Sequence, residues 1–102
     1  MALDTHTLKV GESRILGIRV SRTVAGSTTR IAPDSATINV IDSEEEDVIG
    51  ETAATISGTS IYHLVTGSNV TAEAGTYTVI WKVTEGTEIF IETQPVVVEA
   101  VT

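Results

Sequence analysis

Apolar and polar residues alternate along much of this chain with the two-residue period of a β-strand. The clearest stretch begins at Tyr77 and places Val79, Trp81 and Val83 at every second position up to Thr84. Side chains of a strand point alternately to its two faces, so this pattern predicts a strand with one buried face. Weaker versions of the same alternation recur before and after this stretch.

Turn-forming residues separate the apolar stretches at intervals of about 8–12 residues, a spacing typical of a sandwich or barrel. The predicted strands are residues 6–10, 13–22, 36–41, 48–49, 53–57, 60–65, 77–84 and 88–101. We expect a loop of Ser, Thr and Gly at residues 23–34 and a charged loop at residues 42–47. Gly50 is expected to break the short strand before it. Pro95 is expected to interrupt the last strand or to place it at a sheet edge.

The inward-facing positions of these strands define a predicted core. Its members are Leu16, Ile18, Val20, Ile38, Val40, Ile56, Leu64, Tyr77, Val79, Trp81, Val83 and Ile89. Composition agrees with an all-β chain, because 17 Thr, 13 Val and 11 Ile stand against 4 Leu among 102 residues. β-Branched residues lose side-chain freedom in a helix and pack well on a sheet. We therefore predict one domain over residues 1–102, with residues 1–5 as a flexible arm.

The charges are unevenly distributed. Fourteen acidic residues against six basic ones give a net charge of −8, which disfavours nucleic acids and anionic membranes as partners. Five of the six basic residues lie in the first thirty positions, namely Lys9, Arg14, Arg19, Arg22 and Arg30. These five are the candidate partner-binding residues. They could dock on an acidic partner or on a second copy placed head to tail, unless their clustering is chance.

One short motif precedes the strongest predicted strand. An acidic residue, Glu73, is followed by Gly75 and Tyr77, and Trp81 continues the apolar face beyond them. This order is typical of the tyrosine corner, in which Gly permits a sharp turn between sheets and the Tyr hydroxyl bonds to nearby backbone. The motif predicts an immunoglobulin-like (Ig-like) β-sandwich of about seven antiparallel strands. Gly75, Tyr77 and Trp81 are its structural corner residues.

A family resemblance appears at these residues. Residues 61–64 and 70–86, followed by a Val-rich final stretch, resemble the Ig-like domains of tailed-phage virion proteins, including baseplate upper proteins and small head-decoration proteins. The resemblance covers about residues 35–100. It implies a structural protein of the virion, made in the cytoplasm of a bacterial host. Baseplate proteins are longer, which favours a small accessory subunit.

The resemblance leaves several functions open. The first expectation is a decoration or cementing subunit that binds the major capsid protein of the assembled head and forms a homo-oligomer there. The alternatives are a tail, baseplate or head–tail joining component that contacts tail subunits, or an Ig-like module that binds a receptor or carbohydrate. An exposed patch of Tyr62 and Phe90 would favour carbohydrate binding.

The sequence offers little catalytic or metal-binding chemistry. The acidic run at residues 42–47 lacks the spacing that wraps a Ca²⁺ ion and is predicted to be a solvated loop. His6 and His63 are the two imidazoles, and the chain has no Cys, so no zinc site is expected. No nucleophile-and-base signature or phosphate-binding loop is present. We therefore predict no catalytic residue, no metal and no cofactor, and a protein that is not an enzyme.

Overall fold

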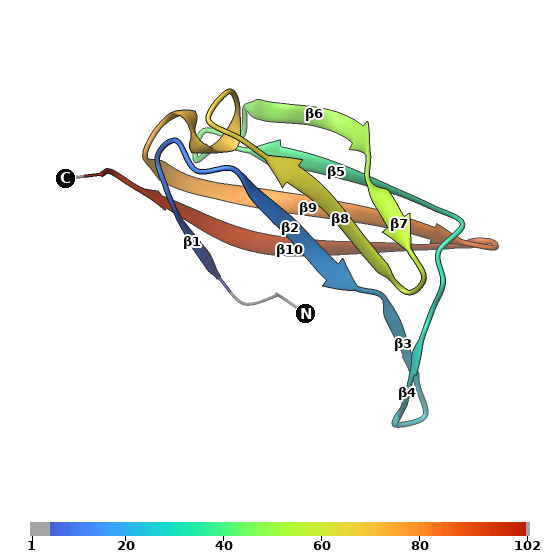
Figure 1. Cartoon of the computed structure of the whole chain (residues 1–102). Helices are drawn as coiled ribbons and strands as arrows, with labels where there is room; N and C mark the ends of the chain where they lie inside the picture. The colour runs from blue at the N-terminus through green and yellow to red at the C-terminus, as the bar shows by residue number, and fades with distance from the viewer. Residues whose placement is uncertain (1–4, 102) are drawn as a thin grey trace.

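A computed structural model describes residues 5–101, which fold into two β-sheets and a projecting two-stranded ribbon (Figure 1). The strands are β1 (His6–Lys9), β2 (Arg14–Arg19), β3 (Ser21–Val24), β4 (Ser27–Arg30), β5 (Ser35–Ile41), β6 (Asp47–Ala53), β7 (Thr55–Ser57), β8 (Ser60–Val65), β9 (Gly75–Glu85) and β10 (Glu88–Glu99). A 3₁₀ turn, η1 (Val70–Ala72), precedes β9. Within the described residues, no helix is long and apolar enough to cross a membrane. The flexibility predicted for residues 1–5 falls largely on residues 1–4, which lie outside the described part.

The larger sheet has five strands in the order β1-β10-β9-β5-β6, and the smaller has three in the order β2-β8-β7. β3 and β4 pair only with each other and form the ribbon. β1 runs parallel to β10, whereas the other strand pairs are antiparallel. The two sheets hold eight of the ten described strands, close to the predicted seven, and β1 with β10 is a parallel pair where antiparallel pairing was predicted.

The core lies between the inner faces of the two sheets. The predicted core residues that are buried are Leu16, Val20, Ile38, Val40, Tyr77, Val79, Trp81 and Val83. Trp81 is fully buried at its centre, and its indole N–H donates to the side-chain oxygen of buried Gln94 at 3.3 Å. This bond satisfies the one polar group that the ring brings into the core.

Three predicted core residues face solvent instead. Ile56, Leu64 and Ile89 are 36%, 50% and 59% exposed, and Ile18 is half-buried. For Leu64 and Ile89 the error is one of strand phase, because the register turns these side chains to the outer face. Ile56 stands opposite buried Ile61, but it lies on the short edge strand β7, all of whose residues are exposed. The buried apolar residues outside the predicted core are Leu8, Ile31, Ala36, Ile61, Val65, Val70, Val96 and Val98.

Residues 21–30 form a ribbon, although residues 21–22 were predicted to end the preceding strand and residues 23–34 to form a loop. Its strands contain almost no apolar residues, so hydrophobic alternation gave no signal for them. The turn between them has Ala25 at φ 51° and Gly26 at φ 83°. Positive φ at both central residues is what a two-residue type I′ hairpin turn requires. Figure 1 shows the ribbon extending away from the sandwich.

β6 and β7 carry the chain from one sheet to the other. β6 continues through Gly50, so the predicted break there is wrong. The chain crosses at Ala54, whose N–H donates to the Ala36 carbonyl at 2.9 Å, and β7 then joins β8 in the smaller sheet. This crossing leaves β6 as one edge of the larger sheet.

β2 and β8 approach each other closely at a glycine. A Cβ atom at Gly17 would lie 2.8 Å from the Ile61 carbonyl oxygen and 3.1 Å from the Tyr62 Cβ. Gly17 pairs directly with Tyr62 in the register of these strands. The absence of a side chain therefore lets the tyrosine occupy this position of the outer face.

Candidate functional site

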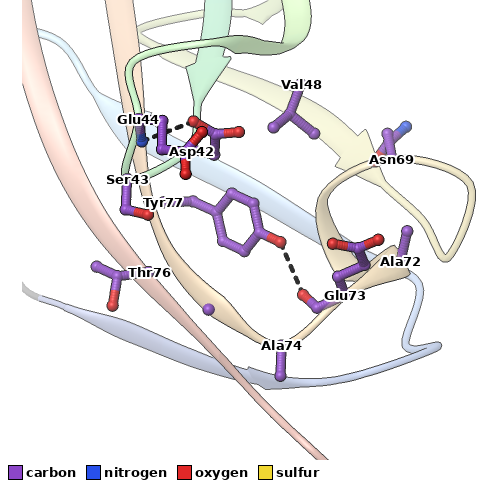
Figure 2. Close-up of a pocket in the computed structure, with 11 residues that line it drawn as sticks. Asp42, Ser43, Glu44, Val48, Asn69, Ala72, Glu73, Ala74, Thr76 and Tyr77 are labelled. Carbon is purple, nitrogen blue, oxygen red and sulfur yellow. Dashed lines mark hydrogen bonds between the residues drawn. The ribbon is translucent and has the colours of Figure 1, made fainter.

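A pocket opens at the end of the sandwich where β9 begins (Figure 2). Its volume is about 410 Å³, and Tyr77 lies within it beside the carboxylates of Asp42, Glu44 and Glu73. The Tyr77 hydroxyl donates to the Glu73 carbonyl at 2.7 Å, the contact that a tyrosine corner makes, and Gly75 turns the chain at φ 156°. Burial, and then the nearby Glu73 and Asp42 carboxylates, raise the pKa of Tyr77. The hydroxyl therefore stays protonated and serves as a structural donor.

The acidic loop on this pocket is held by its own first residue. One carboxylate oxygen of Asp42 accepts the backbone N–H groups of Glu44 at 2.8 Å and Glu46 at 3.1 Å. The backbone N–H of Asp42 donates to the Glu46 carbonyl, which closes the loop between β5 and β6. Across residues 5–101, no group of three or more His, Asp or Glu residues is placed to hold a metal ion. The loop geometry is thus explained by internal hydrogen bonds.

The five candidate basic residues are spread from β1 to the ribbon rather than gathered in one patch (Figure 1). Lys9 pairs with Glu99 at 2.7 Å, and Arg14 pairs with Glu12 at 3.0 Å. The Arg14 guanidinium is the main cause that lowers the pKa of Glu12, followed by the N–H of Lys9. The first thirty residues contribute strands to both sheets, so they do not form a separate basic end.

Arg22 has a structural role at the base of the ribbon. Its guanidinium bonds to Glu85 at 2.6 Å and to Glu88, and lies 5.8 Å from the centre of the Phe90 ring. Its Nε atom is buried with no hydrogen-bond partner among the described residues. Arg19 and Arg30, by contrast, form no ion pair within the described part of the chain. These two remain available for a partner.

The outer face of β9 and β10 carries few charges and exposes apolar side chains. Ile89 and Ile91 of β10 are 59% and 63% exposed there, and Ile80 of β9 is half-buried beside them. Among the outward-facing residues of β9 and β10 that the structure describes, Lys82 and Glu99 carry charges. Both point to charged neighbours, since Lys82 lies 3.9 Å from Glu51 and Glu99 pairs with β1. The rest of this face is Ile, Val, Pro and Thr.

Before Pro95, one edge of β10 has no partner strand within residues 5–101. β1 pairs with residues 96–99 of β10, and no other described strand pairs with that side. The N–H of Val10 donates to the Glu99 carbonyl at 3.0 Å, so the backbone groups of Glu99 face away from β9. Because this direction alternates along a strand, the backbone groups of Ile91 and Thr93 face the same way. Pro95 fits the pattern, since its position is one where no ladder N–H is needed.

The sequence contained a partial signal for this edge. The prediction that Pro95 marks a sheet edge is confirmed, whereas the predicted interruption is wrong because β10 runs unbroken from Glu88 to Glu99. The outward orientation of Ile89 was missed, since it was assigned to the core. The exposed apolar residues therefore lie on the very strand whose edge is uncovered.

Two sheets packed face to face, with β1 parallel to the last strand and a tyrosine corner before β9, define an Ig-like sandwich. Comparison with solved structures confirms this prediction. The chain is similar to titin domains Z1Z2 in complex with telethonin, with a TM-score of 0.52 and 16% sequence identity over 100% of this chain. It spans about half of that structure's chain, 46% of its length.

A chimeric titin Z1Z2 carrying an exogenous KLER peptide from decorin gives the same TM-score of 0.52 and 16% identity, over 98% of this chain and 91% of that one. No family model and no curated protein matches the chain. At this identity the likeness concerns the fold. In the first of these structures, the titin domains Z1Z2 are bound to another protein, telethonin.

Proposed function

We propose that this chain is a non-catalytic protein-binding subunit that docks through the outer face of its five-stranded sheet. The observation that carries this proposal is the weakly charged face formed by β9 and β10, with Ile89 and Ile91 exposed on it. Contiguous apolar surface bordered by polar residues is typical of a protein interface. The threonines around it supply hydroxyl groups without the desolvation cost of charges.

The partner is proposed from the family resemblance. A virion protein of a tailed phage, with the assembled head as its docking site, suits an Ig-like domain of this size that could lay the weakly charged face of β9 and β10 against a lattice. The titin neighbour bound to telethonin supports a protein as the partner of such a fold. Many copies on one particle would add weak contacts through avidity. A tail, baseplate or head–tail joining subunit would differ from a head subunit in its location on the particle.

A carbohydrate-binding role receives less support. Tyr62 is half-buried on the smaller sheet, whereas Phe90 is half-buried on β10 under the Arg22 guanidinium. These rings lie on different sheets and do not form the shared stacking platform that a sugar needs. The protein-binding proposal therefore stands first.

Particles provide the direct test. Virions purified on a density gradient from a bacterium carrying the gene should contain the chain, as detected by mass spectrometry. Purified chain should also bind particles that lack it. Thr78→Lys adds a second lysine to the proposed face, opposite Pro95 of β10, and should weaken this binding by about tenfold or more. Leu64→Lys, on the outer face of the other sheet, is the matched control and should bind normally.

The opposite result is equally clear. Absence of the chain from particles in cells that produce it would reject the virion role. Particle binding that Thr78→Lys leaves unchanged would reject this face as the docking surface. The contribution of an N-terminal arm is tested by removing residues 1–4 alone, because Leu8 is 1% exposed and belongs to the core.

A further inference from the structure

We propose that two copies of this chain associate through β10, pairing antiparallel about a two-fold axis at Ile91. The pairing would join two five-stranded sheets into one continuous sheet. This inference goes beyond the proposed function, because it concerns the chain's association with itself and holds whether or not a particle is bound.

Backbone geometry supplies the first argument. Ile89, Ile91 and Thr93 direct their N–H and C=O groups away from β9, by the alternation fixed at Glu99. No strand within residues 5–101 pairs with these three residues, because β1 stops at the partner of Val96. An edge of this length with exposed apolar side chains is a template for another strand. Burying it against a second edge would satisfy all three residues.

The same residues are self-complementary about Ile91. Antiparallel pairing at this position sets Ile91 opposite Ile91 of the copy, and Ile89 opposite Thr93. The exposed isoleucines of two copies then meet on one face of the joined sheet. Apolar cross-strand pairs of this kind stabilise a sheet.

The register keeps the carboxylates of β10 apart. On the inner face, the pairing sets Glu88 opposite Gln94 and Glu92 opposite Phe90 of the copy, so no two carboxylates stand directly opposite each other. The pairing therefore adds no direct carboxylate contact to the general repulsion of two chains that each carry a net charge of −8.

Space at the edge also suits a strand. A cavity of about 120 Å³ lies below β10, lined by Ile18, Val20, Val83 and Phe90 with a polar rim. In the proposed register, Phe90 is the apolar inward side chain of the copy that faces this space. β1 limits the open part of the edge to the residues before Pro95, which fixes where a second strand can lie.

The test uses the full chain and a charge exchange at the symmetry position. Sedimentation equilibrium over a dilution series should give a monomer–dimer equilibrium for the natural chain. Ile91→Lys and Ile91→Glu each place like charges opposite each other and should weaken the dimer by about tenfold or more. An equimolar mixture of the two variants should restore a heterodimer. Leu64→Lys and Leu64→Glu, alone and mixed, are the matched controls and should behave like the natural chain.

A second variant guards against an effect on folding. Ile91→Pro removes an N–H that faces away from β9, as Pro95 already does in the same strand, and should abolish the dimer while the monomer stays folded. Amide hydrogen exchange at Ile89, Ile91 and Thr93 should be slow in the dimer and fast in the Ile91 variants.

Three results would overturn the pairing. One is a dimer that the mixed Ile91 variants do not restore, which would place the interface elsewhere. Another is a dimer that dissociates when the salt concentration is raised from about 50 to about 500 mM. The Debye length falls severalfold over this range, so such a dimer would be held by a head-to-tail charge contact. The third is a monomer at every concentration. This result would reject the pairing at any exchange rate of the Ile89, Ile91 and Thr93 amides. The particle-binding test is unaffected by any of these results.

Discussion

The two hairpins β9–β10 and β3–β4 differ in residue composition and in burial. β9–β10 is long, and the inner face of its first strand is Tyr77, Val79, Trp81 and Val83, all buried. β3–β4 has four residues in each strand, and Arg22 is its one residue that is not fully exposed. The first hairpin is held by the core. The second is held by its turn and by a single side chain that reaches back to the sandwich.

This difference separates two kinds of stability in one small domain. Isolated two-stranded ribbons are marginal in water, so the β3–β4 ribbon is expected to open without unfolding the sandwich. Loss of a core residue of β9 is expected to unfold everything together, since both sheets pack on it. Substitutions in the two hairpins should therefore produce effects that differ in size and in extent.

The largest effect is expected at the centre of β9. Trp81→Ala would leave a cavity in the core and remove the donor to Gln94, at a cost of about 3–5 kcal/mol in the free energy of unfolding. Urea denaturation measures this loss. Val24→Ala, at the exposed tip of the ribbon, is the control and should change stability by less than about 0.5 kcal/mol. Equal effects at the two positions would contradict the comparison.

A smaller effect is expected where β9 begins. Tyr77→Phe removes the hydroxyl that donates to Glu73 and should cost about 1 kcal/mol at neutral pH. The pKa of Tyr77 is raised by burial, so its contribution is fully present below the ordinary tyrosine pKa of about 10 and is lost as pH rises through the folded value. Urea denaturation at increasing alkaline pH should show the two proteins converging. A constant difference would place the hydroxyl outside the core.

The ribbon should respond mainly to the loss of its anchor. Arg22→Ala removes the contacts with Glu85, Glu88 and Phe90, which are partly exposed, and should cost about 0.5–1 kcal/mol overall. Amide hydrogen exchange should accelerate within the ribbon and stay unchanged in β9. Arg30→Ala, on the opposite strand of the ribbon, is the matched control. Equal acceleration in the two variants would rule out the anchoring role.

The smallest effect is expected to be stabilising. Ala25 has a positive φ of 51°, a conformation that costs an L-residue about 1–2 kcal/mol, and Ala25→Gly would relieve it. Glycine loses more freedom on folding, so the net gain should be at most about 0.5–1 kcal/mol. Slower amide exchange in Val24 and Ser27, the hydrogen-bonded pair that closes the turn, with an unchanged urea midpoint for the sandwich, would report it. Faster exchange would show that the turn is not strained.

The comparison also explains which features the sequence could predict. β9 could be predicted from the sequence, because four large side chains repeat at every second residue and no charged residue stands among them on the inner face. β10 was ambiguous, because Ile89 and Ile91 are apolar while Glu92 occupies the alternate face. Its phase is decided farther along, where Val96 and Val98 enter the core. The ribbon left no hydrophobic signal and depended on turn geometry at Ala25 and Gly26.

The candidate site was predictable in part for a related reason. A proline such as Pro95 signals an edge from the sequence alone. The direction of the backbone groups before it requires the pairing of β1 with β10, which no local pattern encodes. In the same way, the partners of Arg22 lie 63 and 66 residues away in the chain. A count of basic residues could not show that this one is already engaged.

The parallel pairing of β1 with β10 also determines when the larger sheet can be completed during synthesis. Leu8 pairs in register with Val98, so ninety residues must be made between the two halves of this contact. At about 5–20 residues per second, that interval is about 5–18 s. During this time Leu8 has no sheet to enter, and the larger sheet lacks its edge. A translational pause after β9 would therefore prolong the exposure of Leu8, and the larger sheet is completed once β10 has been made rather than stepwise along the chain.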